Sequence, residues 1–140
     1  MAYAEKQIIN FNETAITLAS TGIKARWTPG VQGGTIRRWG LQLEQATTTT
    51  AAVVTLRLRP TPGSASGEVI VETLTLSATE AAGTTVYGKN LLQSVLPGQQ
   101  VVISVDTAAT AGALTYAFME FDPDWEVPDN GGATVISRTT

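Results

Sequence analysis

The chain of 140 residues has a low charge density, with 15% charged residues, and its 43% hydrophobic content includes only 6% aromatic residues. It contains no Cys and no His, which excludes disulfides, zinc sites of the usual Cys/His kind and any mechanism that needs an imidazole base. Its net charge of −3 argues against electrostatic binding of nucleic acid.

Neither a membrane span nor a secretory signal is expected. No apolar run reaches the length of about 18 residues that a spanning helix needs, and residues 1–6 lack the apolar core of a signal peptide. With no Cys to oxidise, the chain is expected to be made in a reducing cytoplasm.

Short runs in which apolar and polar residues alternate predict an all-β fold. Pro and Gly separate many of these runs, as in Pro29-Gly30 and Pro97-Gly98, and both residues favour turns over strands. Eight strands form a two-sheet antiparallel β-sandwich of the jelly-roll or Greek-key type. These strands are expected over residues 6–11, 14–19, 22–27, 35–45, 53–59, 68–76, 100–106 and 113–121.

Three segments are less regular. The apolar parity changes within residues 68–76, which predicts a β-bulge near Glu72 or Thr73, or a strand that switches sheets. Residues 79–96 are expected to be a loop that can hold one short helical turn. The strand at 113–121 is apolar on both faces, so it is either central in its sheet or offers one face to another chain.

The domain is expected to end at residue 121, and residues 122–140 read as an extended C-terminal arm rich in Pro, Gly and Asp. Calcium binding on its acidic residues is a weak alternative, because the spacing does not match a calcium loop. Glu120 and Asp122 have a spacing that a glycosidase pair could use, but nothing in the sequence supplies the apolar pocket or the partner that a general acid would need. No metal, cofactor or catalytic residue is therefore predicted. The acidic residues of the arm are Asp122, Asp124, Glu126 and Asp129.

Three tryptophans offer a possible stacking platform for sugars. Trp27 and Trp39 share the parity of core residues, so both are expected inside the sandwich. Trp125 lies in the polar arm, where its ring can anchor into a partner. A carbohydrate- or receptor-binding β-sandwich is therefore the alternative function.

Charge is unevenly distributed along the chain. Residues 24–59 carry six basic residues and one acid, whereas residues 90–137 carry six acids and no base. Either the two groups balance within one domain, or the acidic arm docks on the basic face of another copy. The predicted interface residues are Arg37, Arg38, Arg57, Arg59, Asp122, Asp124, Trp125 and Glu126.

The stretch VLPGQQVVISVD at residues 95–106, followed by AGALTYAFMEF at residues 111–121, resembles the small virion proteins of tailed bacteriophages. In particular, the strand-rich body resembles the jelly-roll decoration, or cement, proteins that bind the outside of a capsid, usually as trimers. The resemblance implies a non-enzymatic structural protein at the capsid surface of a virion. Its expected partners are the major capsid protein and further copies of itself in a trimer, with no nucleic acid and no membrane.

Overall fold

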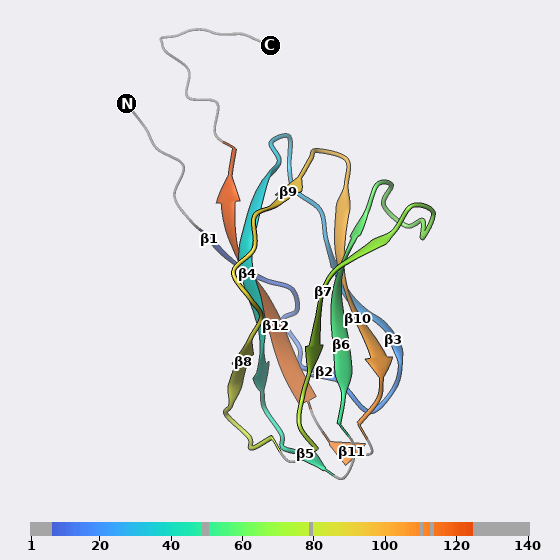
Figure 1. The fold of residues 1–140 in the computed structure, drawn as a ribbon, viewed down its shortest axis with the longest axis vertical. Helices are drawn as coiled ribbons and strands as arrows, with labels where there is room; N and C mark the ends of the chain where they lie inside the picture. Colours follow the sequence, from blue (N-terminus) through green and yellow to red (C-terminus); the bar gives the residue numbers. More distant parts are fainter. Residues whose placement is uncertain (1–6, 49–50, 79, 110, 113, 125–140) are drawn as a thin grey trace, which may run out of the picture.

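The computed structural model describes residues 7–48, 51–78, 80–109, 111–112 and 114–124, and in these ranges the chain is all-β. Two antiparallel sheets face each other and form a β-sandwich (Figure 1), as the alternating pattern predicts. None of the described residues forms a helix that could cross a membrane.

The first sheet has the order β1-β12-β4-β8, with β2 also paired to β12 and β9 also paired to β4. Its strands are β1 (Gln7–Asn10), β2 (Ile16–Thr17), β4 (Gly34–Leu43), β8 (Thr85–Tyr87), β9 (Gln93–Val95) and β12 (Leu114–Pro123).

The second sheet has the order β3-β10-β6-β7. Its strands are β3 (Gly22–Trp27), β6 (Val53–Arg59), β7 (Val69–Thr75) and β10 (Gln100–Thr107). A small separate pair joins β5 (Thr47–Thr48) to β11 (Ala111–Gly112).

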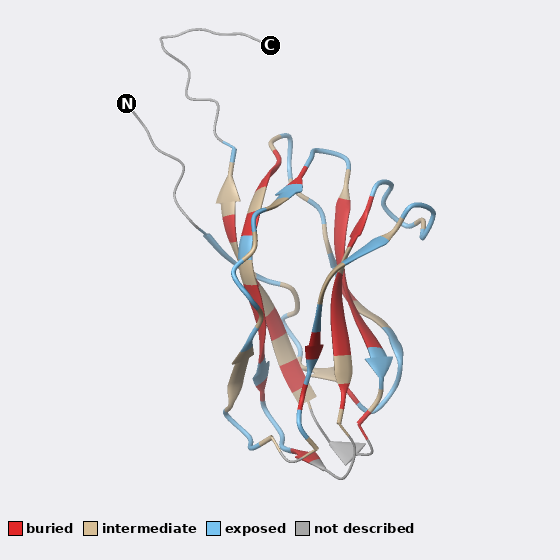
Figure 2. Cartoon of the chain, viewed as in Figure 1, coloured by how far each residue is buried: buried red, intermediate tan, exposed pale blue. Residues whose placement is uncertain are grey.

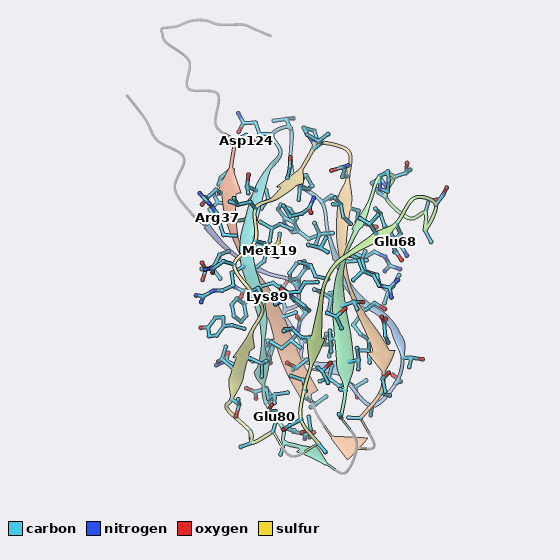
Figure 3. All side chains as sticks on the ribbon, in the orientation of Figure 1. Arg37, Glu68, Glu80, Lys89, Met119 and Asp124 are labelled. Atoms are coloured by element: carbon cyan, nitrogen blue, oxygen red, sulfur yellow. The ribbon has the colours of Figure 1, made fainter. Side chains whose placement is uncertain are left out.

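The core lies between the sheets, and buried residues recur along the long strands of both sheets (Figure 2). Met119 of β12 lies between the sheets in Figure 3 and has no solvent exposure. Each large aliphatic side chain buried there stabilises the fold by about 2 kcal/mol relative to an exposed one. The apolar alternation in the sequence turns nine residues of three strands inward, and the structure buries all of them: Trp39, Leu41 and Leu43 of β4, Val54, Leu56 and Leu58 of β6, and Val101, Ile103 and Val105 of β10.

The segment 79–96 differs from the expectation. It contains the two short strands β8 and β9, both paired with β4, and no helical turn within its described residues. The sequence favours a helical turn because Leu91, Leu92, Val95 and Leu96 have helical spacing, with residues 80–83 as a second place for one. In the structure Val95 is fully buried as the end of β9, while Leu92 stays 79% exposed. Strands of three residues are too short to display an alternation in the sequence.

The change of apolar parity in the sequence of β7 is a β-bulge and not a switch of sheets. The extra residue is Val71, because Leu56 pairs with Glu72 while Arg57 pairs with Ile70.

The last strand, β12, runs to Pro123, so the expected boundary at residue 121 falls inside a strand. It is central in its sheet, with its inner face buried and its outer face half-buried.

The chain enters and leaves the sandwich at the same end. Gln7 of β1 pairs with Phe121 of β12, since the two strands run antiparallel. Three loops lie at this end, which we call the tip: residues 28–33, 60–67 and 96–99 (Figure 1). Contacts tie these loops to the sandwich. Gly33 packs so closely on the carbonyl oxygen of Val95 that no Cβ fits there, and Gly63 N donates to Gln100 Oε1 over 3.2 Å.

Candidate functional site

The four arginines of the expected interface do not form one basic face. Arg37 and Arg38 lie on β4 in the first sheet, whereas Arg57 and Arg59 lie on β6 in the second. All four are on the outsides of the sandwich, and the two pairs therefore face away from each other. Figure 3 shows the separation, with Arg37 on one flank and Glu68, the partner of the second pair, on the other.

A β-bulge turns both Arg37 and Arg38 to the same side of their sheet. Successive residues of a regular strand face opposite sides. In β4, however, Arg38 pairs with Glu120 while Ile36 pairs with Phe121, so Arg37 is an extra residue. Ile36 and Trp39 consequently both point into the core, and the two guanidinium groups between them both face solvent.

Both of these arginines form ion pairs with acids of β12. Arg37 Nε pairs with Asp122 Oδ2, and Arg38 Nη2 lies 2.8 Å from Glu120 Oε2. The Arg38 guanidinium also stacks on the ring of Tyr87, 4.2 Å from its centroid. That ring meets Phe118 edge to face at 5.7 Å. Aromatic packing therefore fixes the plane of Arg38.

A groove of about 940 Å³ opens beside these pairs on the outer face of the first sheet. One wall is the segment 90–92, which backbone hydrogen bonds hold against β4: Leu91 N donates to Arg37 O over 2.6 Å, and Gly88 N donates to Trp39 O over 2.8 Å. The residues that line the groove are Arg37, Arg38, Asn90, Leu91, Leu92, Glu120 and Asp122.

On the opposite face, Glu68 bridges Arg57 and Arg59. Its carboxylate lies 2.6 Å from Arg59 Nε and 2.9 Å from Arg57 Nη1, while Arg57 Nη2 also lies 2.7 Å from Asp106 Oδ2. The Arg59 and Glu68 side chains are only 7% and 12% exposed. Both arginines are therefore occupied within the chain and do not form an open basic face.

These contacts shift two pKa values in the direction that strengthens the network. The hydrogen bond from Arg59 is the largest influence on the pKa of Glu68 and lowers it, burial opposes this, and the Arg57 hydrogen bond lowers it further. For Arg57, burial lowers the pKa, but the hydrogen bonds to Glu68 and Asp106 outweigh burial and raise it. Both groups stay charged at neutral pH.

The positive charges of the four interface arginines are thus balanced within the domain. Each of the four interface arginines pairs with an acid of the same chain, and three of these acids come from the acid-rich half. Of the two explanations left open, the internal one accounts for these arginines. Docking of the acidic arm on another copy stays a prediction, because Trp125, Glu126 and Asp129 lie outside the described residues.

The acidic arm is described only at its start. Asp122 lies in β12 and pairs with Arg37, and Asp124 N donates to Gly33 O over 2.9 Å. Trp125, Glu126 and Asp129 lie outside the described residues. In the part of the chain that the structure describes, no three acidic side chains gather as a cation site would need.

Trp39 lies inside the sandwich as expected, whereas Trp27 is only partly inside it. Trp39 is fully buried, and its Nε1 donates to Glu72 Oε1 of the opposite sheet over 2.6 Å. Trp27 is half-buried and meets Phe121 edge to face, with ring centroids 4.9 Å apart. Neither ring offers a flat exposed platform for a sugar.

The tip has a different surface from either outer face. Its three loops contain no charged residue, and they hold four of the six prolines. Val31 is 93% exposed there and Leu96 is 56% exposed. A hollow of about 230 Å³ adjoins Val31, between the loop 28–33 and the paired ends of β1 and β12. Surfaces depleted of charge with exposed apolar side chains are typical of the centres of protein interfaces.

Reasoning from the sequence missed the groove and the tip. The groove depends on the bulge at Arg37. The sequence signal for this bulge was that Ile36 and Trp39, both inward-facing, are three positions apart, whereas inward residues of a regular strand are an even number of positions apart. The tip depends on loops that are far apart in the sequence. The lack of charge in these loops was visible in the sequence, but their proximity in the fold was not.

Comparison of the chain with protein-family models, curated proteins and solved structures gives no match.

Proposed function

We propose that the chain is a non-enzymatic structural protein that decorates a tailed-bacteriophage capsid and attaches through its tip to the major capsid protein. The tip carries this proposal. It combines exposed Val31 and Leu96 with three loops that carry no charge of their own, so a protein surface can cover these loops without burying an ion. The exposed Asp124, whose N donates to Gly33 O, lies beside them.

The rigidity of the tip also supports attachment. Pro29, Pro60, Pro62 and Pro97 restrict the loop backbones, so less conformational entropy is lost when a partner orders them. The anchored Gly33 and Gly63 link the loops to the sandwich. A shaped surface of this kind suits a partner with a fixed structure, such as an assembled capsid lattice.

The order of the strands supports the jelly-roll assignment within this proposal. If β1 with β2 and β8 with β9 each count as one interrupted strand, and the short β5 and β11 are set aside, eight strands remain, in the orders 1-8-3-6 and 2-7-4-5. Neighbours in each sheet are therefore mostly distant in sequence, as in a chain of two Greek keys folded into two sheets.

Such a protein would stabilise the capsid through contacts that it makes with several capsid subunits at once. A decoration protein that touches several capsid subunits adds buried area to each boundary, so separating the subunits also breaks these contacts. The proposed assembly is a trimer at the virion surface, as in the proteins that the chain resembles. A solution mass near three times 14.7 kDa is expected by light scattering, and a strict monomer that lacks capsid affinity would contradict the assembly.

Co-sedimentation with empty capsids of the cognate phage tests the proposal. Val31→Glu places a charge at the most exposed apolar position of the tip and should weaken capsid binding by about tenfold or more. Ala81→Glu is the matched control, because it adds the same charge on an exposed loop at the opposite end. If the wild-type chain stays in the supernatant, or if both variants bind as tightly as wild type, attachment through the tip is wrong.

A further inference from the structure

The groove on the outer face of the first sheet differs from the tip in its chemistry. Its polar lining consists of two guanidinium groups, two carboxylates and the Asn90 amide, and its apolar lining is Leu91 and Leu92. Its volume of about 940 Å³ is within the range of small-ligand sites. The lining therefore offers a ligand both hydrogen-bonding groups and apolar contact.

Charge pairing argues against an ionic ligand. Arg37 is paired with Asp122, and Arg38 with Glu120, so the two positive and two negative groups of the groove sum to zero. An anion would have to compete with the carboxylates, and a cation with the guanidinium groups. A neutral ligand that donates hydrogen bonds to the carboxylates and accepts them from the guanidinium groups leaves both pairs in place.

The ion pairs also argue against an apolar protein surface. Covering them with apolar atoms removes their water without replacing its hydrogen bonds, and this desolvation opposes binding. Hydroxyl groups do replace those hydrogen bonds, because each hydroxyl both donates and accepts. The groove therefore favours a polyhydroxyl ligand over an apolar protein surface.

The remaining parts of the groove fit the other half of a sugar. Leu92 is 79% exposed beside the ion pairs and offers apolar contact to the C–H faces of a pyranose ring. The segment that carries it is held by the hydrogen bond from Leu91 N to Arg37 O, and Tyr87 fixes the plane of Arg38. The polar groups are thus preorganised before any ligand arrives.

From this combination we infer that the groove is a binding site for a neutral oligosaccharide. The site lies on the outer face of β4 and β12 and shares no lining residue with the hollow of the tip, so it adds an activity to capsid attachment and does not depend on it. A decoration protein with such a site would bring the particle into contact with glycans on a surface.

The test uses the full-length chain and a panel of neutral pentasaccharides of glucose, mannose and galactose, with sialyllactose as an acidic comparison. Saturation-transfer NMR detects binding, and calorimetry gives the Kd. At least one neutral saccharide should bind, and Leu92→Glu should raise its Kd by about tenfold or more. The inference is overturned if no neutral saccharide binds, if sialyllactose alone binds, or if Leu92→Glu has no effect.

Two control variants keep the result specific. Leu96→Glu makes the same change at an exposed leucine of the tip and should leave the Kd for sugar unchanged while weakening capsid binding. Arg37→Gln should weaken sugar binding, whereas Arg26→Gln, on an exposed position of the other sheet, should not. Since capsid binding responds to Leu96 and sugar binding to Leu92, either proposal can fail while the other stands.

Discussion

Replacing Trp39 by alanine is expected to lower the free energy of unfolding by about 4 kcal/mol, in the range for buried tryptophans cut back to a methyl group. Trp39 is the largest side chain with no exposure, and it reaches from β4 to the opposite sheet. The loss combines the transfer of the indole out of water with the cavity left between the sheets. Urea unfolding followed by circular dichroism measures it.

A second substitution at the same position separates packing from hydrogen bonding. Trp39→Phe keeps an aromatic ring but removes the Nε1 donor to Glu72 Oε1, and should cost about 1 to 2 kcal/mol plus a smaller packing term. Glu72 would keep the hydrogen bond from Lys89 N, at 2.8 Å. We expect the loss of packing to account for most of the destabilisation in the alanine variant. If the phenylalanine variant were as unstable as the alanine variant, the hydrogen bond would account for most of it, and this expectation would be wrong.

Strands that bury one face could be predicted from the sequence, because alternation is a local property. β3 and β6 begin and end at the expected residues, 22–27 and 53–59. β8 and β9 could not be predicted, since three residues do not establish a period. They are strands because β4 lies alongside and supplies hydrogen-bond partners.

The site was less predictable than the fold because its contacts are distant in sequence. Arg57 and Asp106 are separated by 49 residues, and they meet because β10 pairs with β6. Until that pairing is known, a run of arginines reads as a basic face. Arg37 and Arg38 were correctly singled out as surface residues, but the acids and the segment 90–92 that complete the groove come from other strands and loops.

The charge pattern therefore has a structural explanation that also constrains function. Acids and bases that are separated along the chain are paired in the fold, which balances the charges of Arg37, Arg38, Arg57 and Arg59 on the outer faces. The tip loops reach the same neutrality by having no charge at all. Binding in the groove and binding at the tip are then governed by shape, apolar contact and hydrogen bonds. The Kd of each proposed interaction should therefore change little with salt concentration.

Glu68→Gln is expected to destabilise the sandwich by about 3 kcal/mol, the magnitude for removing one partner of a buried ion pair. The substitution preserves the shape of the side chain but leaves the Arg59 guanidinium, only 7% exposed, without its neutralising charge. Glu44→Gln, at an exposed position, is the matched control and should change stability by less than about 0.5 kcal/mol. A change at Glu68 as small as the control's would show that solvent screens the pair.

Acid should progressively remove this contribution of Glu68. Because the pKa of Glu68 is lower in the folded chain than the ordinary value of 4.5, the folded state binds fewer protons than the unfolded state. The stabilisation is present above the unfolded pKa and is lost as pH falls through the folded pKa. Urea unfolding at about pH 7, 5, 4 and 3 should therefore show the gap between wild type and Glu68→Gln narrowing below about pH 4.5. A gap that stays constant to about pH 3 would mean that folding does not shift the pKa of Glu68, so the charge of its carboxylate would not account for the gap.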